Sequence, residues 1–120
     1  MSKRILFVDD SEDWRLIVAE ALREAGYQVK AVSCAGEALL QMDEADLALI
    51  ILDLDLGGEN GLMLMKHLKR HHPNTPVLLY TGMQHHDEEA IERMRQQGAA
   101  HFMRKGKIEE LLKKVEAVLE

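Results

Sequence analysis

The 120-residue chain lacks the features that mark secreted and membrane proteins. Its single cysteine, Cys34, excludes an internal disulfide and fits a reducing compartment. The longest strongly apolar run, residues 47–52, is far shorter than the roughly 20 residues of a membrane-spanning helix. Residues 3–4 are basic, but only four apolar residues follow before Asp9, which is too few for a signal peptide. We therefore expect a cytoplasmic protein that does not bind membranes.

An excess of positive charge is also missing. Lys and Arg total 15 whereas Asp and Glu total 21, which gives a formal net charge of −6. A negatively charged chain is a poor general binder of nucleic acid, so direct nucleic-acid binding is not expected. Internal repeats, low-complexity segments and linkers are absent too, so the length fits one domain over residues 1–120.

Short apolar runs alternate with stretches of helical periodicity along the whole chain. The apolar runs predict β-strands at residues 5–8, 27–32, 47–52, 77–80 and 100–104. The helical periodicity predicts α-helices over residues 14–25, 35–42, 62–72, 87–97 and 108–119. This alternation predicts an α/β fold: a doubly wound (βα)5, flavodoxin-like arrangement, with helices on both faces of a five-stranded parallel sheet of order 2-1-3-4-5.

Ionisable residues follow several of the predicted strands. In open parallel sheets, functional residues gather beyond the carboxyl ends of the strands, where the strand order switches. Asp9 and Asp10 follow the first strand and Asp53 follows the third, and these two strands are neighbours at the switch. Thr81 and Lys105 follow the fourth and fifth strands. We expect the three carboxylates to converge on one pocket flanked by the hydroxyl and the ammonium.

The chemistry of such a pocket favours phosphoryl transfer. Three close carboxylates repel one another, and protons or a cation must relieve the repulsion. An open, all-oxygen site suits Mg²⁺, which keeps several waters and accepts phosphate oxygens as further ligands. Together with Lys105 and Thr81, the site suits the oxygens of a phosphoryl group in transfer. Asp53 is then the natural nucleophile, because a carboxylate accepts a phosphoryl group to form an acyl phosphate.

These residues also carry a resemblance to a known family. The acid pair, Asp53, Thr81 and Lys105 stand in order on successive strand ends, and Gly58 and Gly61 follow Asp53. In this arrangement the whole chain resembles the receiver domain of two-component response regulators. Each short motif is weak by itself, but four in register on a five-unit α/β pattern are specific together. The resemblance implies a receiver domain with no output domain, either a stand-alone regulator or a part of a larger protein.

The resemblance implies how the pocket is used. Asp53 would be phosphorylated by a histidine kinase or a histidine phosphotransfer domain in a reaction that depends on Mg²⁺. Asp10 would ligate the ion directly, Asp9 would ligate it partly through water, and the backbone carbonyl of Asp55 would complete the protein ligands. Slow hydrolysis of the acyl phosphate would follow, so the domain is expected to be a phosphoacceptor and not an enzyme in the usual sense.

The resemblance also implies a conformational switch that controls a downstream partner or an output domain. Thr81 would place its hydroxyl on the phosphoryl group, and Lys105 would pair with a phosphoryl oxygen. Phe102 stands where the family often has a Tyr or Phe that turns inward on activation. Thr81 and Phe102 are therefore the predicted switch residues.

Three positions depart from the family pattern. Gly57 stands where Pro is usual, so the loop after Asp53 is expected to be looser. Gly106 follows Lys105 where Pro is usual, and we expect this peptide bond to be trans because a cis bond before a non-proline residue costs ~3 kcal/mol. Asp55 adds a carboxylate two residues past the nucleophile, and a side chain that faces the site would alter the lifetime of the phosphoryl group.

Two alternative functions stay open at this point. Residues 53–55 read Asp-Leu-Asp, which resembles the first motif of haloacid-dehalogenase-type phosphatases. Against that family, the acid pair comes early, Leu56 occupies the usual Thr or Val position, and a cap segment is lacking. The second alternative is a receiver-like module that binds a partner without phosphorylation. Loss of an acid is its usual sign, and all three acids are retained here.

Overall fold

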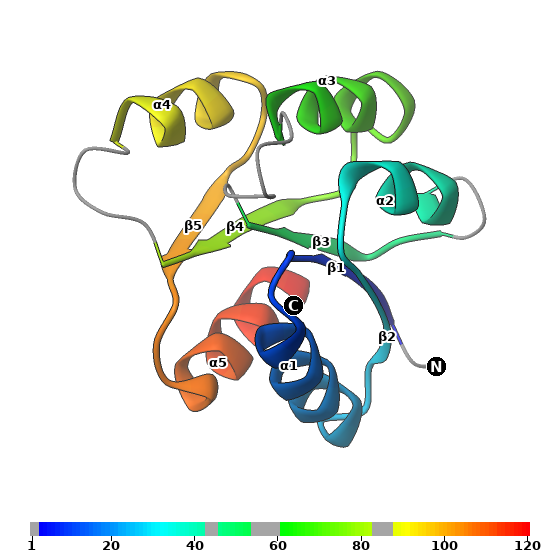
Figure 1. The fold of residues 1–120 in the computed structure, drawn as a ribbon, viewed down its shortest axis with the longest axis vertical. Helices are drawn as coiled ribbons and strands as arrows, with labels where there is room; N and C mark the ends of the chain where they lie inside the picture. Colours follow the sequence, from blue (N-terminus) through cyan, green and yellow to red (C-terminus); the bar gives the residue numbers. More distant parts are fainter. Residues whose placement is uncertain (1–2, 43–45, 54–60, 83–87) are drawn as a thin grey trace.

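The computed structural model describes residues 3–42, 46–53, 61–82 and 88–120. Within them, strands and helices alternate as predicted (Figure 1). The strands are β1 (Arg4–Val8), β2 (Gln28–Val32), β3 (Leu49–Leu52), β4 (Val77–Thr81) and β5 (His101–Arg104). The helices are α1 (Glu12–Glu24), α2 (Ala35–Met42), α3 (Gly61–His71), α4 (Glu88–Gln96) and α5 (Ile108–Leu119). None of the helices in these residues is both long enough and apolar enough to cross a bilayer.

The strands form one parallel sheet in the order β2-β1-β3-β4-β5, which confirms the predicted doubly wound topology. Helices α1 and α5 cover one face of the sheet, and α2, α3 and α4 cover the other (Figure 1). In the register of β1 and β3, Val8 pairs with Leu52. The residues that follow these two strands, Asp9 and Asp53, therefore start from neighbouring positions at the same edge of the sheet.

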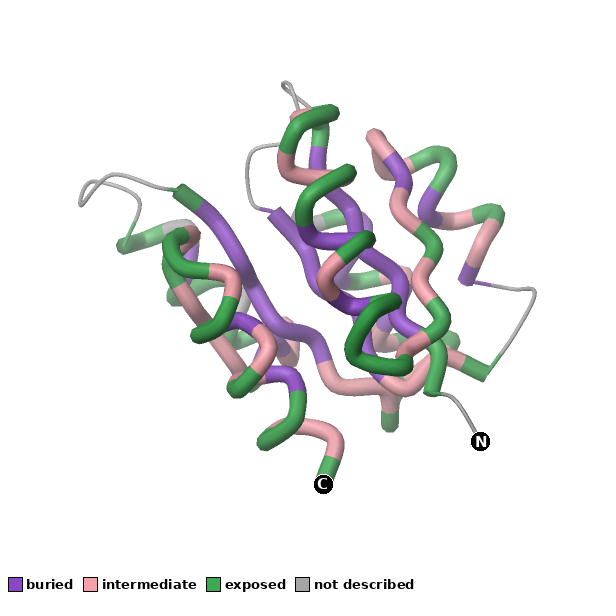
Figure 2. The backbone as a smooth tube through the Cα atoms, turned by 90° about the horizontal axis from the view of Figure 1, so that it is seen from below, coloured by how far each residue is buried: buried purple, intermediate pink, exposed green. Residues whose placement is uncertain are grey.

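Each face of the sheet has its own hydrophobic core. Figure 2 shows that buried residues concentrate in the strands and exposed residues on the outer sides of the helices. All residues of β3 and β4 are buried, as expected for central strands of a sheet covered on both faces. Successive side chains alternate between the two cores: Leu49 and Ile51 pack toward α1 and α5, and Ile50 and Leu52 pack toward α2 and α3.

Helices α2 and α5 have the predicted bounds, and the ends of the other elements differ from the predicted ones by at most two residues. The third strand starts at Leu49 and not at residue 47, although the Ala48 backbone N–H already donates to the Arg4 carbonyl. The fourth strand includes Thr81, whose carbonyl accepts a hydrogen bond from the Lys105 N–H at 2.9 Å. Thr81 is thus the last residue of β4 and does not follow the strand, because pairing with the chain at the end of β5 extends that far.

Local signals set the start and the end of α1. Ser11 caps the helix, since its hydroxyl oxygen accepts a hydrogen bond from the Trp14 backbone N–H at 3.3 Å. Gly26, which the sequence predicts as the stop, adopts φ +101°, a conformation that glycine reaches without strain. Capping at Ser11 fixes the first turn of α1 directly beside the acid pair.

Candidate functional site

The acid residues from β1 and β3 come together at the carboxyl edge of the sheet. Asp9 is fully buried, Asp53 is nearly so, and Asp10 is exposed. One carboxylate oxygen from each lies within 4.8 Å of the other two. The Asp53 backbone N–H donates to the Val8 carbonyl at 3.0 Å, which continues the β1–β3 pairing into the site. The predicted convergence of the three carboxylates is therefore observed.

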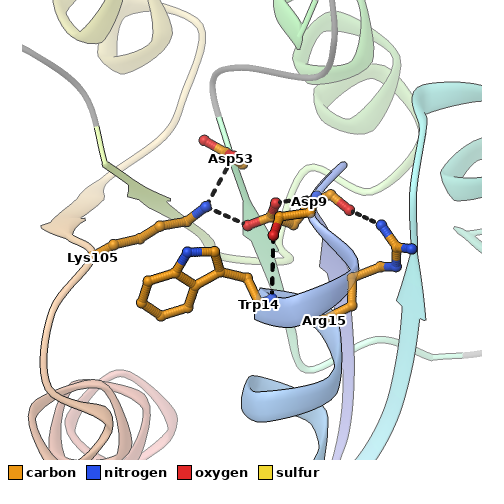
Figure 3. A network of polar contacts seen from close by, with 6 residues as sticks. Asp9, Trp14, Arg15, Asp53 and Lys105 are labelled. Atoms are coloured by element: carbon orange, nitrogen blue, oxygen red, sulfur yellow. Dashed lines mark hydrogen bonds and ion pairs between the residues drawn. The ribbon is translucent and has the colours of Figure 1, made fainter.

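Lys105 enters the same pocket from the end of β5. Its Nζ lies 2.6 Å from Asp9 Oδ2 and 3.1 Å from Asp53 Oδ2, and its side chain is only 10% exposed (Figure 3). The ammonium thus lies between two buried carboxylates and relieves part of their repulsion. The backbone around Lys105 contains no cis peptide bond, as expected for a lysine followed by Gly106.

Burial and neighbouring charges have opposite effects on the pKa values of Asp9 and Lys105. Burial raises the pKa of the Asp9 carboxyl, although the Lys105 ammonium and the Ser11 N–H, which donates to Asp9 Oδ1 at 2.9 Å, oppose the shift. Burial lowers the pKa of Lys105, but the hydrogen bond to Asp9 and the negative charges of Asp53 and Asp9 outweigh it, and the net shift is upward. Lys105 therefore stays protonated at neutral pH.

The predicted switch residues lie on adjacent strands. Thr81 is 2% exposed at the end of β4, and its carbonyl accepts a hydrogen bond from the Lys105 N–H. Phe102 in β5 pairs with Leu79 of β4, is half-buried, and packs against the core on the α2 and α3 side. Thr81 thus lies at the pocket edge, and Phe102 lies farther back on the neighbouring strand.

Part of the predicted site falls outside the described residues. Asp55, whose carbonyl is a predicted ligand, belongs to this part, and so do Gly57 and Gly58. Their contributions remain predictions. Gly61 is described as the first residue of α3.

The structure also shows contacts that the sequence interpretation missed. Lys105 Nζ lies over the Trp14 ring, 5.0 Å from its centroid, and Trp14 meets Tyr80 edge to face. The Arg15 guanidinium donates to the Asp9 backbone carbonyl at 2.8 Å (Figure 3). Trp14 has helical spacing with the apolar residues of α1, so the pattern predicts only burial. An aromatic residue one turn past an acid pair is the one signal that points to the site.

The donor set fits Mg²⁺. The three carboxylates supply only oxygen ligands, and Asp10 is open to solvent, as an ion that keeps several waters requires. The Lys105 ammonium contacts both Asp9 and Asp53, and the Ser11 backbone N–H donates to Asp9. One ammonium does not balance the charge of three carboxylates, so the cluster still favours a cation. An acidic pocket of this kind can hold a divalent cation next to the buried carboxylate of Asp53.

Comparison with known proteins agrees with the fold and the site. The sequence model of the family described as "Response regulator receiver domain" matches residues 5–116 of this chain. The regulatory protein VanRB of Enterococcus faecalis is 34% identical over 119 residues, which cover 99% of this chain and 53% of VanRB. The chain thus spans about half of the length of VanRB. It spans smaller shares of other curated relatives that it matches.

Two solved structures are matched over nearly their full length. The chemotaxis response regulator CheY4 of Vibrio cholerae superposes with a TM-score of 0.90 at 29% identity, with 99% of this chain and 100% of that chain covered. The receiver domain of NtrX from Brucella abortus gives a TM-score of 0.86 at 32% identity, with 96% and 97% covered. A family match of this extent does not favour the phosphatase or the inert module. The chain belongs to the response regulator receiver domain family.

Proposed function

We propose that this domain is a phosphorylation switch in which Asp53 accepts a phosphoryl group in a reaction that depends on Mg²⁺. The observation that carries the proposal is the convergence of Asp9, Asp10 and Asp53, whose carboxylate oxygens lie within 4.8 Å of one another. The Lys105 ammonium is 3.1 Å from Asp53 Oδ2. A nucleophilic carboxylate, acidic metal ligands and a fixed ammonium at one point are the groups that phosphoryl transfer to an aspartate requires.

The proposed donor is a phosphohistidine of a histidine kinase or a histidine phosphotransfer domain. An Asp53 carboxylate oxygen attacks the phosphorus, and the P–N bond breaks with its electron pair kept by the imidazole nitrogen. The imidazole takes up a proton from solvent, and Asp53 carries an acyl phosphate. Water later attacks the phosphorus, releases inorganic phosphate and restores the carboxylate. The domain therefore accepts one phosphoryl group and must lose it before it can accept another.

Each acid has a separate proposed role. Asp10 and Asp53 would hold Mg²⁺ directly, Asp9 would hold it partly through water, and the Asp55 carbonyl would complete the protein ligands. Bound there, the ion would supply positive charge to the oxygens of the transferring group. Lys105, already beside Asp53, would pair with a phosphoryl oxygen once Asp53 is modified.

The proposed response to phosphorylation runs through Thr81 and Phe102. The Thr81 hydroxyl would donate a hydrogen bond to the phosphoryl group, and half-buried Phe102 would turn further inward. The coupling between phosphorylation and this change is expected to be ~1–3 kcal/mol, a shift of population and not a new fold. A downstream partner or an output domain would read the shifted population. We place this switch in the cytoplasm, where a protein with one cysteine stays reduced.

The test is incubation with acetyl phosphate and Mg²⁺, followed by mass spectrometry of the intact protein. One added phosphate is expected on the unsubstituted protein and none on Asp53→Asn. A matched control is Asp46→Asn, which removes an exposed acid just before β3 and should leave the adduct intact. An adduct that survives Asp53→Asn would remove Asp53 from its role, and rapid multiple turnover on phosphate esters would indicate a phosphatase instead.

A further inference from the structure

Contacts along the Lys105 side chain hold its ammonium in the pocket. Its backbone N–H donates to Thr81 at 2.9 Å, but the next residue, Gly106, is exposed. A Cβ built at Gly106 would meet no atom within 4 Å, so the space on that side of the chain after Lys105 is open. The side chain is nevertheless only 10% exposed. Its end must therefore be held by specific contacts.

Two of these contacts are the carboxylates of Asp9 and Asp53, and the third is an indole. Lys105 Nζ lies 5.0 Å from the Trp14 ring centroid, within the range of a cation–π interaction. Figure 3 shows the indole alongside the Lys105 side chain, with the acids beyond the ammonium. The ring face attracts the cation without competing for its hydrogen bond to Asp53 or its ion pair with Asp9.

Trp14 is held both through its backbone and through its ring. The Trp14 backbone N–H donates to Ser11 Oγ at 3.3 Å, and the Ser11 N–H donates to Asp9 Oδ1 at 2.9 Å. The Tyr80 ring, fully buried in β4, meets the indole edge to face with 5.8 Å between centroids and 87° between planes. Trp14 and Tyr80, here called the aromatic pair, thus join the first turn of α1 to the strand beside Lys105.

We propose that Trp14 is a positioning residue for phosphoryl transfer, and that its indole face holds the Lys105 ammonium beside Asp53. The inference rests on the proposed function and adds to it a residue that touches neither the metal ligands' oxygens nor the phosphoryl group. Without the indole, Lys105 would keep its charge but would sample more positions around the acids, and fewer of these would suit an incoming phosphoryl group.

The contact can be tested in the metal-free protein, without any phosphoryl transfer. Trp14 is the sole tryptophan, so its emission reports on this ring alone. Lys105→Met is expected to change the emission, because it removes a charge 5.0 Å from the ring. The matched control is Lys107→Met, which removes an exposed lysine two residues away and should leave the emission unchanged. Identical emission from Lys105→Met and the unsubstituted protein would overturn the contact.

The positioning role is tested by a double-mutant cycle on the rate of Asp53 phosphorylation by acetyl phosphate. Trp14→Leu is expected to slow the reaction about 3–10-fold, the range that a partly desolvated cation–π contact supplies. In the Lys105→Met background the same substitution should change the rate less than about twofold, because the cation is already gone. Equal slowing in both backgrounds would show that Trp14 acts independently of Lys105 and would overturn the proposal.

Tyr27→Leu is the matched control for loss of an aromatic side chain. Tyr27 packs against the same core as Trp14 but lies beyond the other end of α1. Its replacement should leave the phosphorylation rate within about twofold of the unsubstituted protein. Slowing by Tyr27→Leu equal to that of Trp14→Leu would reduce the effect to general packing and would overturn the positioning role.

Fluorinated tryptophan tests the contact without changing the packing. Biosynthetic incorporation of mono-, di- and trifluorotryptophan modifies only Trp14, and each fluorine weakens the negative potential of the ring face. The phosphorylation rate is expected to fall stepwise with the number of fluorines. A rate that does not depend on fluorination would overturn the proposal even if Trp14→Leu failed to fold.

The outcomes separate this inference from the proposed function. No adduct on the unsubstituted protein would overturn the proposed function and the positioning role with it. A normal adduct on Asp53, combined with fluorination-independent rates, would overturn only the role of Trp14.

Discussion

Lys105 balances the charge of the pocket at the scale of single residues. Asp9 and Asp53 are both buried, and an isolated buried carboxylate is costly unless a cation or hydrogen-bond donors compensate it. The ammonium approaches Asp9 more closely than Asp53, at 2.6 Å against 3.1 Å. Asp10 is exposed. Lys105 therefore compensates the two buried carboxylates, while Asp10 faces solvent.

Removing this cation should weaken the fold. Lys105→Met leaves two buried carboxylates without their ion pair, and the free energy of unfolding is expected to fall by about 1–3 kcal/mol. Urea unfolding in the presence of a chelator measures the change. Added Mg²⁺ should restore part of the loss, because a divalent ion relieves the same repulsion. Unchanged stability of Lys105→Met in chelator would contradict this account of the charge balance.

The buried phenol of Tyr80 predicts a loss of stability at alkaline pH. Burial raises the pKa of Tyr80 above its ordinary value of 10.0, whereas the unfolded chain keeps the ordinary value. Above pH 10 the folded state therefore holds a proton that the unfolded state releases, and the free energy of unfolding falls as pH rises. Tyr80→Phe keeps the ring and should flatten this decline in urea unfolding between pH 9 and 11.

The control for this pH profile is Tyr27→Phe, which removes the other phenol of the chain. Its profile should follow that of the unsubstituted protein more closely than the profile of Tyr80→Phe does. A Tyr80→Phe profile as steep as the unsubstituted one would show that the Tyr80 phenol is not linked to folding.

At the scale of elements, the start of α1 and the end of α4 are set by local signals and also contact neighbouring elements. The first turn of α1 carries Trp14, and its cap Ser11 contacts Asp9. The end of α4 is closed by Gly98, which adopts φ +112°. The aliphatic part of the Lys69 side chain, from α3, packs directly on Gly98. The residues at these helix ends therefore do more than terminate the helices, because they also contact neighbouring elements.

Two glycine substitutions should have opposite effects on stability. Gly98→Ala places a Cβ in a left-handed conformation and against the Lys69 side chain, and is expected to cost about 1–2 kcal/mol. Gly36→Ala, within α2, meets no atom within 4 Å and should stabilise the protein by about 0.5 kcal/mol. Chemical denaturation measures both, and a gain in stability from Gly98→Ala would contradict the backbone argument.

At the scale of the whole molecule, the parallel sheet brings distant chain segments to one edge. Five strand ends meet at the carboxyl edge, and those of β1, β3 and β5 contribute the acids and the lysine. The two cores on either face hold these ends in place, since β3 and β4 are buried throughout. The pocket is thus a property of the complete fold, and its occupancy should be linked to global stability.

Mg²⁺ is therefore expected to stabilise the whole domain. At ten times the dissociation constant, one bound ion raises the free energy of unfolding by about 1.4 kcal/mol. Thermal unfolding with and without Mg²⁺ measures this shift, and the emission of Trp14 should saturate over the same range of concentration. Asp10→Asn should weaken both responses. A full response retained in Asp10→Asn would exclude Asp10 as a ligand.

The order and type of the elements could be predicted from the sequence because hydrophobic periodicity is a local property. The apolar run at residues 47–52 and the helical spacing of apolar residues over 108–119 indicate directly which residues are buried. The convergence of Asp9, Asp10 and Asp53 followed as well, because strand order places the ends of β1 and β3 side by side. Neither of these predictions depends on the rotamer of any side chain.

Only the tertiary structure decided how Lys105 is held. Whether its ammonium meets Asp9, Asp53 or Trp14 depends on side-chain rotamers and on the distance between α1 and the end of β5, and no local pattern encodes either. The same holds for the edge-to-face contact of Trp14 with Tyr80, in which two apolar positions on different elements meet across the core. Periodicity predicts that such residues are buried, whereas the packing of the whole molecule determines what they touch.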